Sequence, residues 1–156
     1  MKAILLTILI ILADQIIKFY TTSNIALGEA RRFIPGFINL TYTQNTGVAF
    51  SLMADHPWFA LSIVPVLLIA LYVALWRNMF PCKVQYFAMV AIAAGGLSNW
   101  IDRLIHGFVV DMFSFAFVRF AVFNLADIFI TGGAVLFVIA FLSSELRKKG
   151  EGSQDA

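Results

Sequence analysis

The stretch VQYFAMVAIAAGGLSNWIDR, residues 84–103, decides how this chain is built. It carries no charge up to Ile101 and is long enough to cross the roughly 30 Å hydrocarbon core of a bilayer as a helix. Its far end nevertheless holds three polar residues, Asn99, Asp102 and Arg103. Because these are spaced i, i+3 and i+4, a helix places them on one face. The stretch therefore predicts a transmembrane helix with a polar, functional end.

Three further stretches predict, with the first, an all-α membrane protein of four transmembrane helices. Residues 58–76 carry no charge, whereas residues 3–19 include Asp14 and Lys18, and residues 120–142 include Asn124 and Asp127. Hydrophobic residues make up 61% and charged residues 13% of the chain, against about 25% charged in a soluble domain. With a mean hydropathy of +0.88, this balance excludes a disordered chain and a nucleic-acid-binding protein.

An even number of spans places both termini on one side, which we expect to be the cytoplasm. The basic cluster Arg147–Lys149 directly follows the last span, as is typical of cytoplasmic ends. The first stretch also has the form of a cleaved signal peptide, but no small-x-small motif follows Ala13. We expect residues 1–149 to form a single domain and residues 150–156 to form a disordered cytoplasmic tail.

In this orientation the polar residues of three helices lie at one depth, near the outer membrane boundary. A charge at the bilayer centre costs about 2.5–3.5 kcal/mol, so clustering at one level favours a shared site over chance. Gly95-Gly96 and Gly132-Gly133 remove side chains from two of these helices and permit their close approach. Asn124 has the position of a helix N-cap, with Asp127 in the first turn.

The connections between spans on the outer side are unusual. Alternating apolar residues predict a strand over residues 37–44, Gly47 permits a turn, and residues 48–52 are expected to form the return strand. The result would be a small β-rich insertion, at about residues 33–53, with an irregular loop as the alternative. Residues 106–119 are expected to form an apolar loop that lies against the bilayer or the helices. Asp111 lies in this loop, and a partly dry environment raises the pKa of a carboxyl.

Most kinds of catalytic site lack their residues. Only His56 and His106 are available as bases for a serine nucleophile, and two histidines fifty residues apart give no zinc-ligand spacing. Cys82, the single cysteine, lies at the inner end of the spans and excludes an internal disulfide. We therefore expect neither a metal nor a cofactor.

The groups that remain as candidates for catalysis are the carboxylates. Lys18 is placed to neutralise Asp14 at i, i+4, and if Arg103 neutralises Asp102, the carboxylates of Asp111 and Asp127 are left over. Two carboxyls that share a dry site hold one proton between them and activate a water, which is the chemistry of aspartyl proteases.

At this point the chain resembles the bacterial lipoprotein signal peptidases, also called signal peptidase II. The similarity covers residues 5–145, and its five motifs are specific because they occur in order on a four-span chain. They are Asp14-Gln15-x-x-Lys18, Asn45-Thr46-Gly47-x-Ala49-Phe50, Asn99-x-x-Asp102-Arg103, Val109-Val110-Asp111 and Phe123-Asn124-x-Ala126-Asp127. The chain departs from the family pattern at Ser98, where glycine is usual, and at Ile128, where a small residue is common.

The resemblance implies an endopeptidase that removes the signal peptide of prolipoproteins, cutting just before the diacylglyceryl-modified cysteine. It implies that Asp111 and Asp127 are the catalytic pair. The residues that it implies as substrate-binding or supporting are Asp14, Lys18, Asn45, Asn99, Asp102, Arg103 and Asn124. It further implies a multi-pass protein of the bacterial inner membrane, acting as a monomer near the outer face with lipid and lipidated substrate as its partners. Which aspartate starts protonated stays open, although a helix N-terminus favours the anion and hence Asp127 as the base.

Two other classes of protein are alternatives. A small proton-coupled transporter also uses intramembrane aspartates, and a structural membrane subunit uses polar helix ends to bind a partner. The carboxylates of this chain stop at one depth, and no inverted repeat is visible, which argues against transport.

Overall fold

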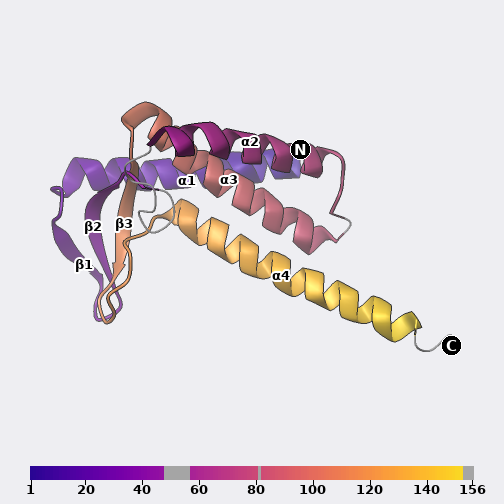
Figure 1. Cartoon of the computed structure of the whole chain (residues 1–156). Helices are drawn as coiled ribbons and strands as arrows, with labels where there is room; N and C mark the ends of the chain where they lie inside the picture. The colour runs from indigo at the N-terminus through magenta and orange to yellow at the C-terminus, as the bar shows by residue number, and fades with distance from the viewer. Residues whose placement is uncertain (48–56, 81, 153–156) are drawn as a thin grey trace.

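The computed structural model describes residues 1–47, 57–80 and 82–152, which form four helices and one three-stranded sheet (Figure 1). The sheet lies at one end of the helices, and both termini and the α2–α3 connection lie toward the other end (Figure 1). In chain order the elements are α1 (Lys2–Asn24), β1 (Ala30–Ile34), β2 (Ile38–Asn45), α2 (Pro57–Trp76), α3 (Lys83–His106), β3 (Val109–Phe115) and α4 (Leu125–Gly152).

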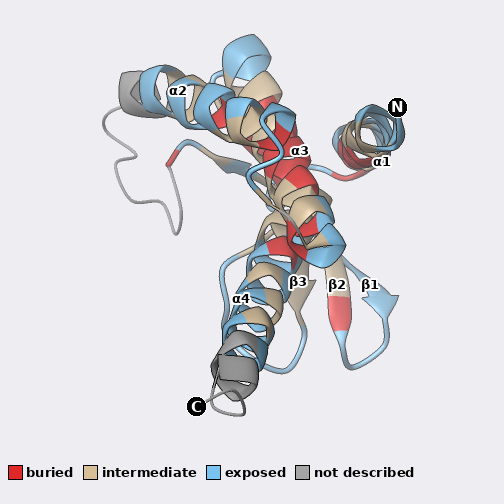
Figure 2. Ribbon diagram, turned by 90° about the vertical axis from the view of Figure 1, so that its right-hand side faces the viewer, coloured by how far each residue is buried: buried red, intermediate tan, exposed pale blue. Residues whose placement is uncertain are grey.

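Helix α3 is the centre of the bundle, and α1, α2 and α4 all pack against it (Figure 2). Helix α1 shows how the bundle is adapted to lipid. Its buried residues include Asp14, Lys18 and Thr21, whereas apolar residues such as Leu5 and Leu12 are exposed. This polar-inside, apolar-outside pattern is the reverse of a soluble helix and fits a helix surrounded by hydrocarbon.

Three of the four expected spans are confirmed as candidates by length and composition, namely Lys2–Asn24, Lys83–His106 and Leu125–Arg147. The fourth, α2, is an apolar helix of 20 residues that contains Pro65. Its described apolar part, Leu61–Trp76, is shorter than the other three. The crossing by α2 therefore stays a prediction.

The sheet has the order β1-β2-β3, with both neighbouring pairs antiparallel. The strand expected over residues 37–44 is confirmed as β2, Ile38–Asn45. Its partners differ from the expectation, because β1 begins before residue 33 and β3 comes from the connection that we expected to be a loop. The expected return strand, residues 48–52, lies outside the described residues.

Strand β3 escaped prediction because its sequence does not alternate. Val109, Val110, Asp111 and Met112 are all buried, so both faces of the strand are covered and the polar–apolar alternation disappears. The tail also differs from the expectation. Helix α4 continues to Gly152, beyond the expected boundary at residue 150, and residues 153–156 lie outside the described part of the chain.

Glycines allow α3 and α4 to approach closely, as the sequence predicts. A Cβ atom on Gly95 would lie 2.5 Å from the Ala126 carbonyl oxygen, and one on Gly133 would lie 2.8 Å from the Ala88 carbonyl oxygen. Gly132, in contrast, has nothing within 4 Å of its Cβ position. The close contact therefore depends on one glycine from each pair, and it brings the start of α4 against the polar end of α3.

Candidate active site

Lys18 is the centre of a buried charged cluster between α1 and α3. Its Nζ lies 2.7 Å from Asp14 Oδ2 and 2.8 Å from Asp102 Oδ2, and it donates a hydrogen bond of 2.9 Å to Asn99 Oδ1. Lys18, Asp14 and Asp102 are at most 3% exposed. Buried charges persist only when paired and hydrogen-bonded, and each of these is both.

Asp14 and Asp102 are further occupied by hydrogen bonds that tie the elements together. Asp14 accepts from Ser98 Oγ at 2.7 Å and from the Ala126 backbone N–H at 2.9 Å, which joins α1 to α3 and to α4. Asp102 accepts from Gln15 Nε2 at 2.7 Å and from the Val110 backbone N–H at 3.1 Å. With these partners both carboxylates are structural anchors.

Arg103 and Asp102, whose pairing the sequence allowed, form no ion pair among the described residues. Consecutive helical residues point in different directions, so the two side chains do not face each other. Lys18 pairs with Asp102 instead, while Arg103 donates to the carbonyl oxygens of Gly47 and Asn99. Arg103 thus holds the chain just after β2 against the end of α3.

Asp111 and Asp127 are linked through two amide side chains. Asn124 Nδ2 donates to Asp111 Oδ1 at 2.7 Å and to Asn99 Oδ1 at 3.1 Å, and Asn99 Nδ2 donates to Asp127 Oδ1 at 2.8 Å. The continuous chain from Asp111 through Asn124 and Asn99 to Asp127 brings together residues that come from β3, α3 and the start of α4. On the other side Asn45 Nδ2 donates to Asp111 Oδ2 at 2.9 Å.

Local structure at two turns sets the positions of these carboxylates. Gly107 ends α3 with a φ of +81°, a left-handed conformation that glycine adopts without strain, and β3 follows directly. Asn124 caps α4 as predicted. Asn124 Oδ1 accepts from the Asp127 N–H at 2.9 Å, and Asp127 Oδ2 accepts from the Asn124 N–H at 3.2 Å, which is a reciprocal capping box.

The environment of Asp111 favours its protonated form. The pKa of its carboxyl is raised from 3.8 to about 6, chiefly by burial and also by the negative charge of Asp127. The amides of Asn45 and Asn124 and the charge of Lys18 act in the opposite direction, since they stabilise the anion. A carboxyl that titrates near neutral pH, next to a second carboxyl, is suited to acid–base chemistry.

The structure brings together all nine residues that the sequence singled out. Two further members, Gln15 and Ser98, had been named only as part of a motif and as a departure from the family pattern, without a role in the site. Ser98 is fully buried, donates to Asp14, and accepts a hydrogen bond of 3.2 Å from Gln15 Nε2. Their positions in the sequence pointed to the site, because Gln15 directly follows Asp14 and Ser98 directly precedes Asn99. Their roles could not be predicted, since they depend on how α1 and α3 are rotated against each other.

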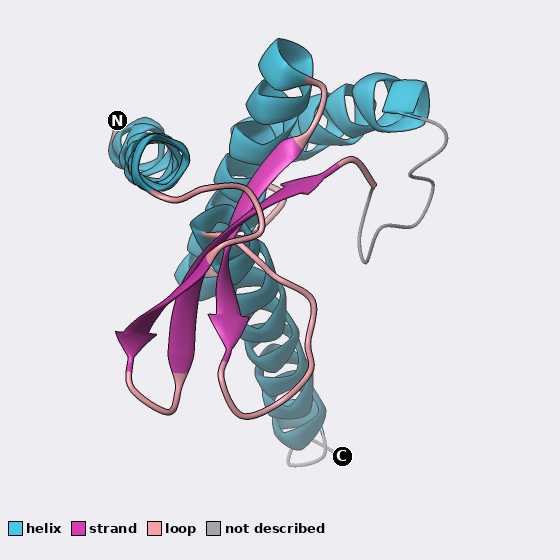
Figure 3. Ribbon diagram, turned by 90° about the vertical axis from the view of Figure 1, so that its left-hand side faces the viewer, coloured by secondary structure: helices cyan, strands magenta, loops and turns pink. Residues whose placement is uncertain are grey.

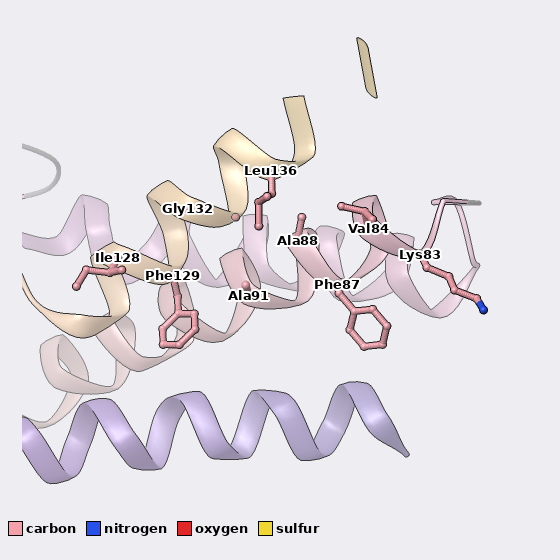
Figure 4. Close-up of a pocket in the computed structure, with 10 residues that line it drawn as sticks. Lys83, Val84, Phe87, Ala88, Ala91, Ile128, Phe129, Gly132 and Leu136 are labelled. Atoms are coloured by element: carbon pink, nitrogen blue, oxygen red, sulfur yellow. The ribbon is translucent and has the colours of Figure 1, made fainter. Parts of the chain in front are cut away.

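An apolar groove of about 450 Å³ runs between α3 and α4 (Figure 4). Ile128 and Phe129, next to Asp127 in the sequence, lie at one end of it, and Lys83 lies at the other (Figure 4). Gly132 and Ala91 line the groove with small residues, which leaves space between the two helices. The groove supplies apolar surface beside the polar cluster and no chemical group that takes part in it. Among the described residues no three His, Cys, Asp or Glu side chains form a group that could hold a metal ion.

One buried and one half-buried carboxyl, linked by amides at one end of a bundle of apolar helices, form the arrangement expected of an intramembrane aspartic hydrolase. Comparisons with known proteins agree with this class. The family model described as signal peptidase (SPase) II matches residues 6–143. The chain therefore belongs to the signal peptidase II family and is an aspartic peptidase.

Relatives and solved structures support the assignment. The chain is 41% identical over 141 residues to a lipoprotein signal peptidase of Streptococcus pneumoniae, with 90% of this chain and 92% of the relative covered. It is also 41% identical to one of Streptococcus pyogenes, with 91% and 93% covered. A solved structure described as a bacterial membrane enzyme superposes with a TM-score of 0.88 at 30% identity, covering 94% of this chain and 91% of that chain. A second has a TM-score of 0.82 at 30% identity, covering 90% and 92%.

Proposed function

We propose that this protein removes the signal peptide from prolipoproteins by cutting before the diacylglyceryl-modified cysteine, with Asp111 and Asp127 activating a water. The division of the four clustered aspartates carries the proposal. Lys18 neutralises Asp14 and Asp102, whose other hydrogen bonds are structural, whereas Asp111 and Asp127 are coupled to each other through Asn99 and Asn124.

The reaction needs one ionised and one protonated carboxyl. Asp127 lies at the N-terminus of α4 and accepts a backbone N–H, which favours its anion. It takes a proton from water as the water oxygen bonds to the scissile carbonyl carbon. Asp111 holds its proton up to about pH 6 because of its raised pKa, and in that form donates a hydrogen bond to the carbonyl oxygen. The carbon–nitrogen bond then breaks, and a proton from the pair goes to the leaving amine, leaving a carboxyl and an amine as products.

The supporting residues act through the catalytic pair. Asn45, Asn99 and Asn124 fix the two carboxyls by donating amide hydrogen bonds to them. Lys18 orients Asn99, because an ammonium on Oδ1 leaves Nδ2 free to face Asp127. The reaction in this proposal uses neither a metal nor a thiol. Cys82 immediately precedes the first turn of α3, the opposite end of that helix from Asn99.

The membrane arrangement completes the proposal. We place the protein in the bacterial inner membrane as a monomer with four spans, both termini in the cytoplasm and the catalytic pair near the outer face. The position of the α2–α3 connection, on the same side as both termini, supports a crossing by α2 (Figure 1). A catalytic pair at this depth meets a scissile bond held next to lipid-anchored cysteine, while the acyl chains remain in the bilayer.

Purified protein and a synthetic lipidated peptide test the proposal. Asp111→Asn and Asp127→Asn should each lower turnover by at least about 10²–10⁴-fold, the usual contribution of acid–base catalysis. Both variants should reach normal membrane levels and still bind the peptide. Glu29→Gln is the matched control, since it makes the same exchange at a carboxyl on the loop before β1 and should leave turnover unchanged. Substantial turnover by either aspartate variant would refute the dyad. Failure of the wild-type protein to cut the peptide would favour a transporter or a structural subunit.

A further inference from the structure

An exposed aromatic surface lies at the end of the sheet, away from the catalytic pair. It consists of residues from the end of β1, from the β1–β2 turn and from the segment between β3 and α4, and is here called the tip cluster. Its members are Phe33, Ile34, Phe37, Phe117, Val118 and Phe120, which are between 46% and 65% exposed. A compact group of exposed aromatic and aliphatic side chains marks an interaction surface.

The tip cluster is an ordered structure. Gly36, with a φ of +73°, forms the turn between β1 and β2, and the Phe37 N–H bonds the Ile34 carbonyl oxygen at 3.0 Å. The two parts of the cluster are joined by a hydrogen bond of 2.9 Å from the Ala116 N–H to the Phe37 carbonyl oxygen. The rings of Phe37 and Phe117 stack with centroids 5.7 Å apart. The exposed rings are therefore held in place by backbone and ring contacts.

The direction of the strands determines what lies beside these rings. The strands run across the helix axes, so they lie in the plane of the membrane (Figures 1 and 2). Viewed along the helices, the β1–β2 end of the sheet lies to one side, between α1 and α4, while the β3–α4 connection overlaps α4 (Figures 2 and 3). The β1–β2 end of the tip cluster is therefore held beside the helices. Its depth is that of the boundary, because β3 follows the end of α3 and α4 begins just after the cluster.

Basic residues beside the tip cluster fit a position next to lipid headgroups. Arg32 and Arg119 lie directly beside Phe33 and Phe120 in the sequence, and both are exposed. Apolar rings flanked by arginines are the composition of segments that lie in the membrane interface, where the rings enter the acyl boundary and the guanidinium groups meet phosphates.

We infer that the tip cluster inserts into the lipid leaflet on the side of the catalytic pair, with Arg32 and Arg119 on anionic headgroups. The sheet is thereby attached to the membrane at a point outside the helical bundle. This inference does not depend on the proposed cleavage reaction. It uses only the membrane-spanning helices, the strand direction and the exposed side chains.

Spin labels on the full chain in lipid vesicles test the inference. Phe33→Cys and Phe117→Cys, each in a Cys82→Ala background, carry the label in the tip cluster. Ser23→Cys is the control, because Ser23 is exposed and lies roughly 7 Å beyond Lys18 along α1. Labels at 33 and 117 should be relaxed more by oxygen, which concentrates in lipid, than by a water-soluble nickel chelate. The label at 23 should show the reverse.

Two outcomes would overturn the inference. One is a label at 33 and 117 that is as accessible to the nickel chelate as the label at 23. The other is shielding from both reagents that disappears on dilution with lipid, which would assign the cluster to contact with a second copy of the chain. Arg32→Gln with Arg119→Gln should move both tip labels toward water in vesicles that contain anionic phospholipid. An unchanged depth in such vesicles would contradict the role of the arginines.

Discussion

At the scale of single residues, the ammonium group of Lys18 decides which carboxylates are free to react. It neutralises Asp14 and Asp102 together, so the pair Asp111 and Asp127 lacks an ion-paired partner among the described residues and depends on amide donors. Amides stabilise a carboxylate less than an ammonium does, and the pair therefore holds one proton up to about pH 6. The chemistry of the site follows from this unequal distribution of donors.

Asn45 provides a test of the pKa of Asp111. In the wild type, kcat/KM should fall on the alkaline side with an apparent pKa near 6, where the pair loses its last proton. Asn45→Ala removes a hydrogen bond that stabilises the Asp111 anion, so the pKa should rise and the alkaline limb should move to higher pH. A shift of about one unit is expected, since one unit is about 1.4 kcal/mol, the size of one net hydrogen bond. A limb that moved to lower pH would contradict the assignment.

Arg103 has a supporting role that a lysine replaces only in part. Its guanidinium donates to the carbonyl oxygens of Gly47 and Asn99. Arg103→Lys keeps the charge but loses the planar fork, so one of these bonds should be lost at a cost of about 1 kcal/mol. We expect a lower melting temperature, an increased KM and residual cleavage. Full activity at wild-type stability would show that the contact to Gly47 is dispensable.

The sequence predicted the residues of this site better than their partners. Spacing on helices was enough to group Asn99 with Asp102 and to predict the capping role of Asn124. It could not show that Lys18 bridges two carboxylates, because that depends on the packing of α1 against α3. The same limit applies to Ser98, whose partner Asp14 lies 84 positions away in the chain.

At the scale of elements, the helices were predictable and the sheet was not. Long apolar runs mark helices clearly, whereas β1 is exposed throughout and the start of β3 is buried on both faces, so neither shows alternation. The pairing of β2 with β3 joins residues far apart in sequence, which local patterns do not encode. As a result Asp111 appeared to lie in a loop, although a strand holds it.

The approach of α3 to α4 gives a prediction with an internal control. Gly95→Ala places a methyl group 2.5 Å from the Ala126 carbonyl oxygen and 2.8 Å from Ile130 Cγ1, so α4 must move outward. We expect a loss of stability of about 1–3 kcal/mol, as for overpacked cores. Cleavage should fall as well, because the Ala126 N–H that binds Asp14 moves with α4.

Gly132→Ala is the control for Gly95→Ala, since it makes the same exchange in α4 where nothing lies within 4 Å. It should keep wild-type activity and gain up to about 1 kcal/mol of stability from helix propensity. Thermal unfolding in detergent and the peptide assay measure both variants. Equal effects at the two positions would mean that the helices are not in close contact at Gly95.

At the scale of the whole molecule, the distribution of basic residues predicts the orientation in the membrane. The end of the bundle with both termini carries Lys2, Arg77, Lys83, Arg147, Lys148 and Lys149, and the end with the sheet carries Lys18, Arg31, Arg32, Arg103 and Arg119. Six basic residues against five is a small difference, but three of the five at the sheet end already bind other groups of the protein. Lys18 and Arg103 are bound within the site, and Arg31 pairs with Glu29 at 2.7 Å.

Basic residues that hold a site or an ion pair are retained for that purpose, so the other group indicates the cytoplasmic side. Reporter fusions at residue 80, in the α2–α3 connection, and at residue 30, at the start of β1, check this orientation. A reporter that works only in the cytoplasm should be active at 80, and one that works only outside should be active at 30. The opposite result at both positions would place the catalytic pair at the inner leaflet. Activity of the cytoplasmic reporter at both would show that α2 does not cross the membrane.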